Sequence, residues 1–273
     1  MSRSRVTVRM LSSMKKKGEK IVALTAYDYS TAKLEEEAGV HVILVGDSFQ
    51  MAVLGEDTTL GADIDVLLAH CSAVKKAAPC ALVVGDMPFG SYQPSDETAV
   101  ANAVRFISGA GADAVKLEGG NAAAVSRVRA IVDAGIPVMG HIGLLPQSIK
   151  AEGTYRVVRS DSKIALSEQL KALEDAGAFA VVLEMMEEDL ARGLTRGSSI
   201  PTIGIGAGRY TDGQILVVND MLGMNGDFNP RFLKKYADLH SVMKKAIGEY
   251  AEEVSRGTFP GEGNVFRERG GTS

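Results

Sequence analysis

Short, nearly continuous apolar runs recur at intervals along the chain. Eight of them are rich in Val, Ile, Leu and Ala, at residues 21–27, 41–47, 80–86, 114–118, 137–141, 179–184, 201–206 and 215–220. Strands that are covered on both faces read as unbroken apolar runs, whereas half-exposed strands alternate apolar and polar positions. The pattern therefore predicts eight buried, parallel strands.

Amphipathic stretches of helical period separate most of these runs, with clear examples at 96–110 and 161–177. The alternation of strand and helix is typical of βαβ units and a parallel sheet. An Ala-Gly pair precedes four of the strands, at 38–39, 110–111, 134–135 and 176–177. Glycine just past a helix end accepts the left-handed conformation that other residues resist, so each pair predicts a helix stop.

Eight strands with this punctuation predict a (β/α)8 TIM barrel, class α/β, formed by residues 1–273 as a single domain with a short N-terminal extension. A doubly wound sheet is the competing architecture, but it would be expected to have a short polar edge strand, and we find none in the sequence. The helical stretch 231–257 is expected to close the barrel from outside, and the tail beyond Phe266 is expected to be loose. The segment 142–160 is long for a connection and is a candidate active-site loop.

Composition and charge narrow the class of function. The chain is 45% hydrophobic and 23% charged, which excludes a disordered or fibrous protein, and its net charge of -4 provides no basic field for nucleic acid or an anionic membrane. No apolar run approaches the length of a membrane span, and the basic N-terminus lacks the pattern of a secretory signal. Cys71 and Cys80 have no metal-type spacing. We expect a cytoplasmic protein whose partner is a small molecule.

Candidate chemistry gathers where the predicted strands end. Four acids and one histidine stand at or just past the carboxyl ends of different runs: Asp47, Asp86, Glu118, His141 and Glu184. In barrels this rim carries the active site. Any one acid there is explained as the N-cap of the next helix. Four acids on one rim repel each other, and this repulsion requires a cation or protonation.

A carboxylate site without cysteine favours magnesium or manganese over zinc. Magnesium takes one or two carboxylates directly, so Asp47 and Asp86 are candidate inner ligands, with Glu118 behind a water molecule. Glu184 is then free to remove the proton next to a carbonyl group while the metal stabilises the enolate. Lys116 lies on the same side of its strand as Glu118, where it binds a substrate oxygen or stabilises one of the acids as an ion pair.

Other signals are weaker. The run GIGAG (204–208) does not fit the dinucleotide or Walker pattern and is best explained as a tight turn after the seventh strand. His41, His70 and His240 fall in or beside apolar or helical segments and are expected to be structural or surface residues.

Several longer strings are specific enough to identify a family. They are VGDS (45–48), DMPFGSYQ (86–93), GADAVKLEGG (111–120), GIPVMGHIGLLPQS (135–148), AGAFAVVLE (176–184) and IPTIGIGAG with DGQ (200–214). The chain resembles the ketopantoate hydroxymethyltransferases of pantothenate biosynthesis, in register from about Val22 to about Phe266.

The resemblance implies a (β/α)8 barrel that transfers a hydroxymethyl group from 5,10-methylenetetrahydrofolate to 3-methyl-2-oxobutanoate through a magnesium-stabilised enolate, giving 2-dehydropantoate and tetrahydrofolate. It implies ring-like homo-oligomers, often decamers. Carried over by residue, it places the metal on Asp47, Asp86 and Glu118, the ketoacid on Asp47, Ser48, Asp86 and Lys116, and the proton acceptor on Glu184, with His141 as polar support.

The chain departs from the family pattern at a few positions. Gly85 stands in VGDMPF where the family commonly has VADMPF, Leu145 in GLLPQS where it has GLTPQS, and Asn219 where it has histidine. The segment 149–161 also differs from the usual glycine-rich, basic run. None of these positions is an expected metal ligand or the expected base. The changed loop does concern how folate binds and which ketoacid is used.

Two rival functions are open from the residues alone. A magnesium-dependent C–C lyase or mutase of the phosphoenolpyruvate mutase/isocitrate lyase type would use the same rim to hold an enolate. Such enzymes usually carry a catalytic cysteine in a KKCGH-like loop, and neither Cys71 nor Cys80 stands in one. A non-catalytic ketoacid-binding protein is the third interpretation, and it would not need the free base Glu184.

Overall fold

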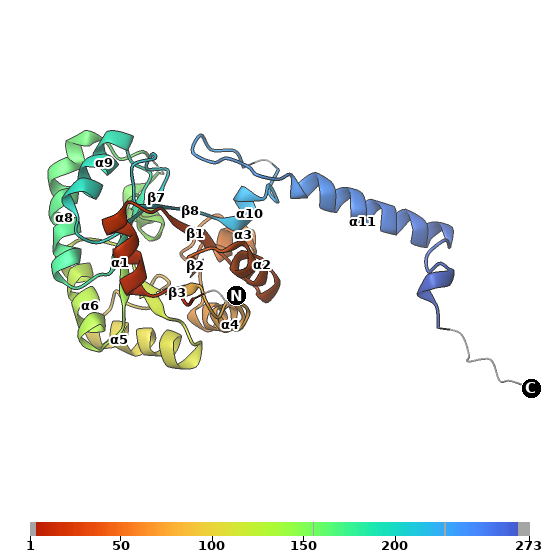
Figure 1. Ribbon diagram of the computed structural model, residues 1–273, viewed down its shortest axis with the longest axis horizontal. Helices are drawn as coiled ribbons and strands as arrows, with labels where there is room; N and C mark the ends of the chain where they lie inside the picture. Colours follow the sequence, from red (N-terminus) through yellow and green to blue (C-terminus); the bar gives the residue numbers. More distant parts are fainter. Residues whose placement is uncertain (1–3, 155, 227, 267–273) are drawn as a thin grey trace, which may run out of the picture. The chain divides into compact units, whose positions relative to one another are not determined.

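The strands of the chain form one closed, parallel barrel in sequence order, β1 to β8. The structure is a computed structural model that describes residues 4–154, 156–226 and 228–266 (Figure 1). The strands are β1 (Ile21–Thr25), β2 (Val42–Val45), β3 (Leu82–Asp86), β4 (Ala114–Lys116), β5 (Val138–Gly143), β6 (Ala180–Glu184), β7 (Thr202–Ile205) and β8 (Gly213–Leu216). The predicted (β/α)8 barrel is confirmed. Seven of the predicted strands are present in place, whereas the eighth, predicted at 215–220, begins at Gly213 and ends at Leu216, and helix α10 (Val218–Met221) takes the rest of that run.

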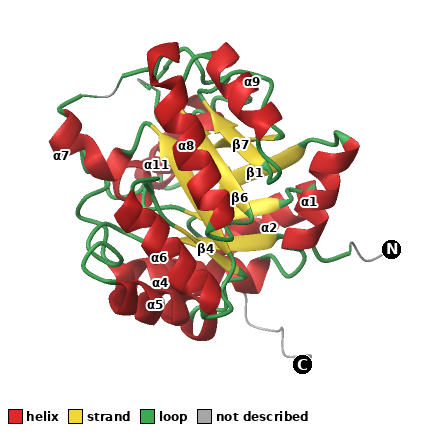
Figure 2. Cartoon of the chain, turned by 90° about the vertical axis from the view of Figure 1, so that its left-hand side faces the viewer, coloured by secondary structure: helices red, strands yellow, loops and turns green. Residues whose placement is uncertain are grey.

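Helices surround the strands on the outside (Figures 1 and 2). Those of the barrel segment are α1 (Val8–Lys17), α2 (Tyr29–Ala38), α3 (Phe49–Ala52), α4 (Ile64–Ala77), α5 (Asp96–Val104), α6 (Ala122–Asp133), α7 (Ile149–Glu152), α8 (Lys163–Asp175) and α9 (Glu188–Gly197). The four predicted stop glycines all have positive φ, from 77° at Gly111 to 94° at Gly177. The helix ends predicted from the Ala-Gly pairs are therefore correct.

The barrel interior is filled by alternate strand residues, because side chains two apart point to the same face. This inner layer comprises Ile21, Ala23, Val42, Leu44, Leu82, Val84, Ala114, Met139, Ala180, Val182, Ile203 and Ile215. Val6, Leu11 and Met14 pack against it from the segment around α1. The N-terminal extension thus contributes to the core, a role that its basic sequence did not indicate.

The predicted helix 96–110 is divided into two parts. The α-helix α5 ends at Val104, and a five-residue π-helix follows from Arg105 to Gly109. The ring of Phe106 in this π-helix packs against the backbone of β3. A Cβ atom built on Gly85 would lie 2.3 Å from the ring of Phe106. Glycine at position 85 therefore provides the space that the ring occupies.

Helix α2 buries one carboxyl group without a partner. Glu35 is 4% exposed, and within the described chain neither of its side-chain oxygens has a hydrogen bond. Burial, and secondarily the negative charge of Asp28, raise the pKa of Glu35 to about 8. At neutral pH this side chain is therefore a neutral acid inside the fold.

The chain divides into two compact units, Met1–Val218 with the barrel and Asn219–Ser273. Helix α10 (Val218–Met221) follows β8, and α11 (Leu239–Arg256) is the long helix of the second unit. The predicted helix 231–257 is wrong at its start, because Asp238 caps the helix by accepting the N–H of Ser241. Helix α11 buries none of its side chains. Its expected packing on the barrel and the single-domain organisation stay predictions, and the tail beyond Phe266 lies outside the described residues.

Candidate active site

The polar side chains at the carboxyl ends of the strands point into the barrel, because each lies two or four residues after an inward-facing apolar residue of its strand. Asp86 follows Leu82 and Val84 on β3, and Glu184 follows Ala180 and Val182 on β6. Lys116 and Glu118 continue from Ala114, while His141 follows Met139 within β5. The backbone ladder to β5 extends past β4, with the Gly119 N–H donating to the His141 carbonyl at 2.9 Å. These five side chains therefore form the top layer of the barrel interior.

Asp86 and Lys116 form a buried ion pair across neighbouring strands. They are register partners of β3 and β4, and the Lys116 Nζ donates to both carboxylate oxygens of Asp86, at 2.8 and 3.0 Å. Burial alone would lower the pKa of Lys116, but the carboxylates of Asp86, Glu118 and Asp47 raise it well above its usual range. Burial raises the pKa of Asp86, although Lys116 opposes this. The lysine remains a cation.

Asp47 and Ser48 lie on the turn after β2, immediately beside this pair. The Asp47 N–H donates to Oδ2 of Asp86 at 3.3 Å, and the hydroxyls of Ser48 and Tyr27 lie 2.9 Å apart. A Cβ atom on Gly46 would lie 2.7 Å from Oγ of Ser48, so glycine provides the space for this turn. Burial first, and then the charges of Asp86 and Glu118, raise the pKa of Asp47 well above its usual range. A cation at this point would reverse that repulsion.

His141 stands between two carboxylates. Its Nδ1 lies 3.4 Å from Oε1 of Glu118, and its Nε2 lies 3.2 Å from Oε2 of Glu184. Burial and Lys116 both lower the pKa of His141, but the two carboxylates outweigh them and raise it to about 9. Despite burial, His141 and Lys116 hold the pKa of Glu118 below its usual range. The Glu184 side chain is 18% exposed, whereas His141 and Glu118 are almost fully covered, so Glu184 is the acid that a ligand can reach.

Two residues of this site were not singled out from the sequence. The Gln147 side chain donates to Oδ2 of Asp47, and its oxygen accepts the hydroxyl of Tyr92 at 2.7 Å. Both lie inside strings that carry the family resemblance, DMPFGSYQ and GIPVMGHIGLLPQS, but neither is an acid or a base. An uncharged amide and a phenol in a polar string give no chemical signal of their own.

The expected active-site loop at 142–160 meets the site at both of its ends. Near its start Gln147 contacts Asp47, and near its end Val158 forms a bridge to the segment after β6. The Val158 N–H donates to the Met185 carbonyl at 2.7 Å. Met185 follows the candidate base Glu184 directly and has a φ of 48°, in the left-handed region that non-glycine residues rarely adopt. Local strain thus lies next to the candidate base.

The expectations for the other three histidines and for the glycine-rich run at 204–208 are confirmed. Nδ1 of His41 accepts the Val22 N–H, His70 donates to the Tyr27 carbonyl, and His240 is exposed. Gly206 and Gly208 have φ values of 61° and 73°, as a tight turn at 204–208 requires.

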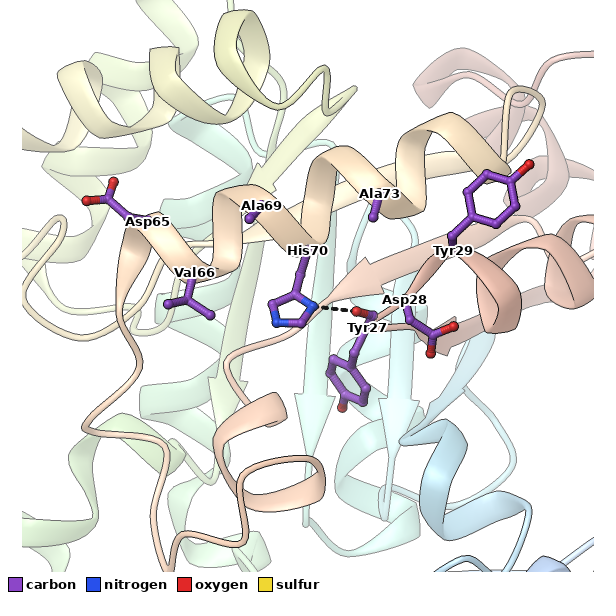
Figure 3. A pocket seen from close by; sticks show the side chains of 8 residues that line it. All are labelled: Tyr27, Asp28, Tyr29, Asp65, Val66, Ala69, His70 and Ala73. Carbon is purple, nitrogen blue, oxygen red and sulfur yellow. Dashed lines mark hydrogen bonds between the residues drawn. The ribbon is translucent and has the colours of Figure 1, made fainter.

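A hollow of about 560 Å³ lies outside the barrel, between the start of α2 and helix α4. Figure 3 shows its lining, with His70 from α4 bonded to the backbone of Tyr27. Tyr27 separates this hollow from the rim, since its hydroxyl contacts Ser48. The hollow contains none of the strand-end acids and is distinct from the site.

Asp47, Asp86, Glu118 and Lys116 are together, as the sequence predicted, with His141 and Glu184 beside them. Across residues 4–154, 156–226 and 228–266, no three His, Cys, Asp or Glu side chains stand as a ready-made metal-binding group. The donor set nevertheless suits a hard cation, because three buried carboxylates face one lysine and the buried Oε1 of Glu118 has no hydrogen bond of ordinary geometry.

Comparison with known proteins identifies the family. The model of the ketopantoate hydroxymethyltransferase family matches residues 5–262. A 3-methyl-2-oxobutanoate hydroxymethyltransferase of Syntrophomonas wolfei is 51% identical over 265 residues, 96% of each chain. One from Dehalococcoides mccartyi is 52% identical over 258 residues, 94% of this chain and 92% of its own.

Solved structures with the same fold are much more distant in sequence. 2,3-Dimethylmalate lyase, a member of the PEP mutase/isocitrate lyase superfamily, aligns with a TM-score of 0.61 at 17% identity, over 97% of this chain and 92% of its own. Phosphonopyruvate hydrolase in complex with oxalate and Mg²⁺ aligns with a TM-score of 0.59 at 13% identity, over 96% and 92%. These likenesses confirm the barrel. In the described part of the chain no helix is long and apolar enough to cross a membrane. By family model and sequence identity, the chain belongs to the ketopantoate hydroxymethyltransferase family.

Proposed function

We propose that the chain is an enzyme that transfers a hydroxymethyl group to C3 of 3-methyl-2-oxobutanoate, with Glu184 as the base that accepts the C3 proton. The observation that carries the proposal is the position of Glu184, a partly exposed carboxylate beside a buried group of three acids and one lysine. The names of relatives about 50% identical over nearly the whole chain support the same reaction. Structural neighbours at 13–17% identity give no separate support to a lyase or mutase.

Asp47, Asp86 and Glu118 are the residues that would hold Mg²⁺. A bound Mg²⁺ would polarise the carbonyl of the ketoacid and stabilise negative charge on its oxygen. Lys116 is proposed to contact the ketoacid as well, because its ammonium group is a buried cation held directly against Asp86. Asp47, Ser48 and Asp86 complete the proposed ketoacid contacts, with the Ser48 hydroxyl held by Tyr27.

Glu184 takes the C3 proton. The electron pair of the broken C–H bond forms a double bond between C3 and the carbonyl carbon, and the carbonyl oxygen becomes the negatively charged oxygen of an enolate. Nε2 of His141 lies 3.2 Å from Oε2 of Glu184, and because the pKa of His141 is raised to about 9, the imidazole is a cation at neutral pH that attracts the carboxylate and orients it. We assign His141 this supporting role. C3 then forms a bond to the one-carbon unit, whose two bonds to the folate nitrogens are replaced by this C–C bond and by a bond to a hydroxyl oxygen from water, so that tetrahydrofolate leaves.

The proposed donor is 5,10-methylenetetrahydrofolate, and one water molecule balances the products 2-dehydropantoate and tetrahydrofolate. The loop 142–160 is the proposed folate side, because it joins the acids at Gln147 and the segment after Glu184 at Val158.

The test separates proton removal from transfer. Purified protein with 3-methyl-2-oxobutanoate and magnesium in D₂O should exchange the C3 proton without folate, and with methylenetetrahydrofolate it should release 2-dehydropantoate. Glu184→Gln keeps the size of the side chain but cannot accept a proton, so exchange should fall by about 10²- to 10⁴-fold while ketoacid binding survives. Glu188→Gln, on α9, is the matched control and should exchange at the wild-type rate. Wild-type exchange in Glu184→Gln would remove Glu184 from the mechanism.

We also propose that the protein is a cytoplasmic homo-oligomer, a decamer as in the resembling family. Helix α11 carries an apolar stripe that offers a face for self-association, formed by Met243, Ile247, Tyr250 and Val254 at helical spacing. The buried thiol of Cys71 fits a reducing compartment.

A further inference from the structure

Gln147 is buried among the acids, and every hydrogen-bonding position of its amide is used. The side chain is 5% exposed. Its Nε2 donates to Oδ2 of Asp47 at 2.9 Å and to the Met87 carbonyl at 3.1 Å. Its Oε1 accepts from Tyr92 at 2.7 Å and from Gln93 at 3.2 Å. A carbonyl oxygen can only accept, so the contact with Met87 fixes the orientation of the amide.

The same residue also holds a second acid through its backbone. The Gln147 N–H donates to Oε2 of Glu118 at 3.0 Å. The Tyr92 hydroxyl accepts a hydrogen bond from the Glu118 N–H at 3.2 Å and donates one to Oε1 of Gln147. One loop residue therefore contacts groups that follow β2, β3 and β4, three neighbouring strands. The separation of Asp47 from Glu118 is set through Gln147.

We propose that Gln147 is a positioning residue for the acids of the site. It occupies Oδ2 of Asp47 and Oε2 of Glu118, so that the oxygens presented to a cation are Oδ1 of Asp47 and Oε1 of Glu118. The latter lies 3.4 Å from Nδ1 of His141 but has no hydrogen bond of ordinary geometry. This inference rests on the proposed function, since it takes these acids as magnesium ligands.

The arrangement couples the loop to the ion. Gln147 belongs to the short 3₁₀ turn at Pro146–Ser148, which runs directly into α7. Gln147 orders the acids that bind the ion, and coupling of this kind is reciprocal. A bound ion should therefore strengthen the hydrogen bonds between the acids and Gln147, and so stabilise the turn at Pro146–Ser148. Magnesium should then protect the backbone amides of 149–152 from hydrogen exchange. A residue that merely filled space would produce no such protection.

The experiment compares magnesium binding in the whole protein by titration calorimetry. Gln147→Met keeps the volume of the side chain and removes the four hydrogen bonds of its amide, whereas the backbone N–H that donates to Glu118 stays. Removing an outer partner of metal ligands typically weakens affinity by about 10- to 100-fold, and this is the expected loss. Gln214→Met makes the same chemical change at an exposed, hydrogen-bonded glutamine of β8 and should leave the affinity within about twofold of wild type.

Further measurements separate positioning from stability. At saturating magnesium, Gln147→Met should recover C3 exchange to within about tenfold of wild type, because Glu184 is intact. Magnesium protection of 149–152 should be present in wild type and absent in Gln147→Met. An unchanged magnesium affinity in a folded Gln147→Met, whatever its unfolding temperature, overturns the inference and leaves the proposed function standing.

A second variant covers the case in which Gln147→Met does not fold. Tyr92→Phe removes only the hydroxyl that supports the amide and the Glu118 N–H, so a magnesium affinity several-fold weaker than wild type is expected. Wild-type affinity in Tyr92→Phe then overturns the inference. A wild-type protein that binds no magnesium and exchanges no C3 proton overturns the proposed function, and the positioning role with it.

Discussion

Replacing Glu35 with glutamine should stabilise the protein, and the gain should grow with pH. The folded chain holds the Glu35 proton up to a pKa of about 8, whereas an ordinary glutamate releases it near 4.5. Below about pH 4.5 both the folded and the unfolded chain are protonated, and this group makes no difference to stability. Between these two values only the folded chain binds the proton, so the free energy of unfolding falls as pH rises.

The size of the stability difference follows from the number of pH units between the two pKa values. Each unit corresponds to about 1.4 kcal/mol, so the wild type loses about 3 kcal/mol by pH 7 and about 5 kcal/mol above pH 8. Glutamine has the shape of the protonated acid and no charge to release. Glu35→Gln should therefore match the wild type near pH 4.5, exceed it by about 3 kcal/mol at pH 7, and reach a constant advantage above pH 8.

Urea unfolding at about pH 5.5, 7 and 8.5, at one protein concentration, measures these differences. Glu37→Gln removes an exposed carboxylate from the same helix and should change stability by less than about 0.5 kcal/mol at each pH. A pH-independent difference between Glu35→Gln and wild type, or a variant less stable at pH 8.5, would refute the reasoning. The comparison does not depend on any assignment at the active site.

Three further outcomes are expected. Asp86→Ala removes a proposed ligand and the partner of Lys116, so calorimetry should find weaker binding of both magnesium and the ketoacid; unchanged binding of either contradicts the assignment. Gly85→Ala should lower the free energy of unfolding by about 1–3 kcal/mol, because its methyl group meets Phe106. Gly109→Ala has open space around its Cβ position and should lower it by less than about 1 kcal/mol, so equal losses of stability in thermal unfolding would contradict the prediction. Light scattering at micromolar concentration should detect an oligomer, and a monomer would disprove the proposed assembly.

The barrel and most of its rim could be predicted from the sequence, because both follow from local pattern. Continuous apolar runs gave the strands, and the Ala-Gly pairs marked the helix ends. Asp86, Lys116, Glu118, His141 and Glu184 also obey the period of two that places them inside the barrel. Because all of them stand at the carboxyl ends of predicted parallel strands, their place on one rim of the barrel follows from the sequence alone.

Other features could not be predicted, because they depend on contacts between distant segments. Gln147 meets Asp47 across 100 positions of the chain, and nothing in either local sequence indicates the pairing. The start of α11 differs from the prediction because helical periodicity continues upstream of Asp238, whereas the capping hydrogen bond of Asp238 makes the helix begin at Leu239. The role of α1 in the core depends on which mouth of the barrel it covers, and a basic amphipathic sequence does not specify this.

The contact between Gly85 and Phe106 constrains the order in which this part of the chain can change. An alanine at position 85, as in the common family string, requires the ring at 106 to withdraw or to be replaced by a smaller side chain. A lineage carrying glycine and phenylalanine must therefore alter position 106 before, or together with, position 85. The reverse order passes through a chain with a methyl group pressed against an aromatic ring, one residue from Asp86. Across the family, the two positions should consequently vary as a pair, and chimaeras that exchange β3 without the following π-helix should fold poorly.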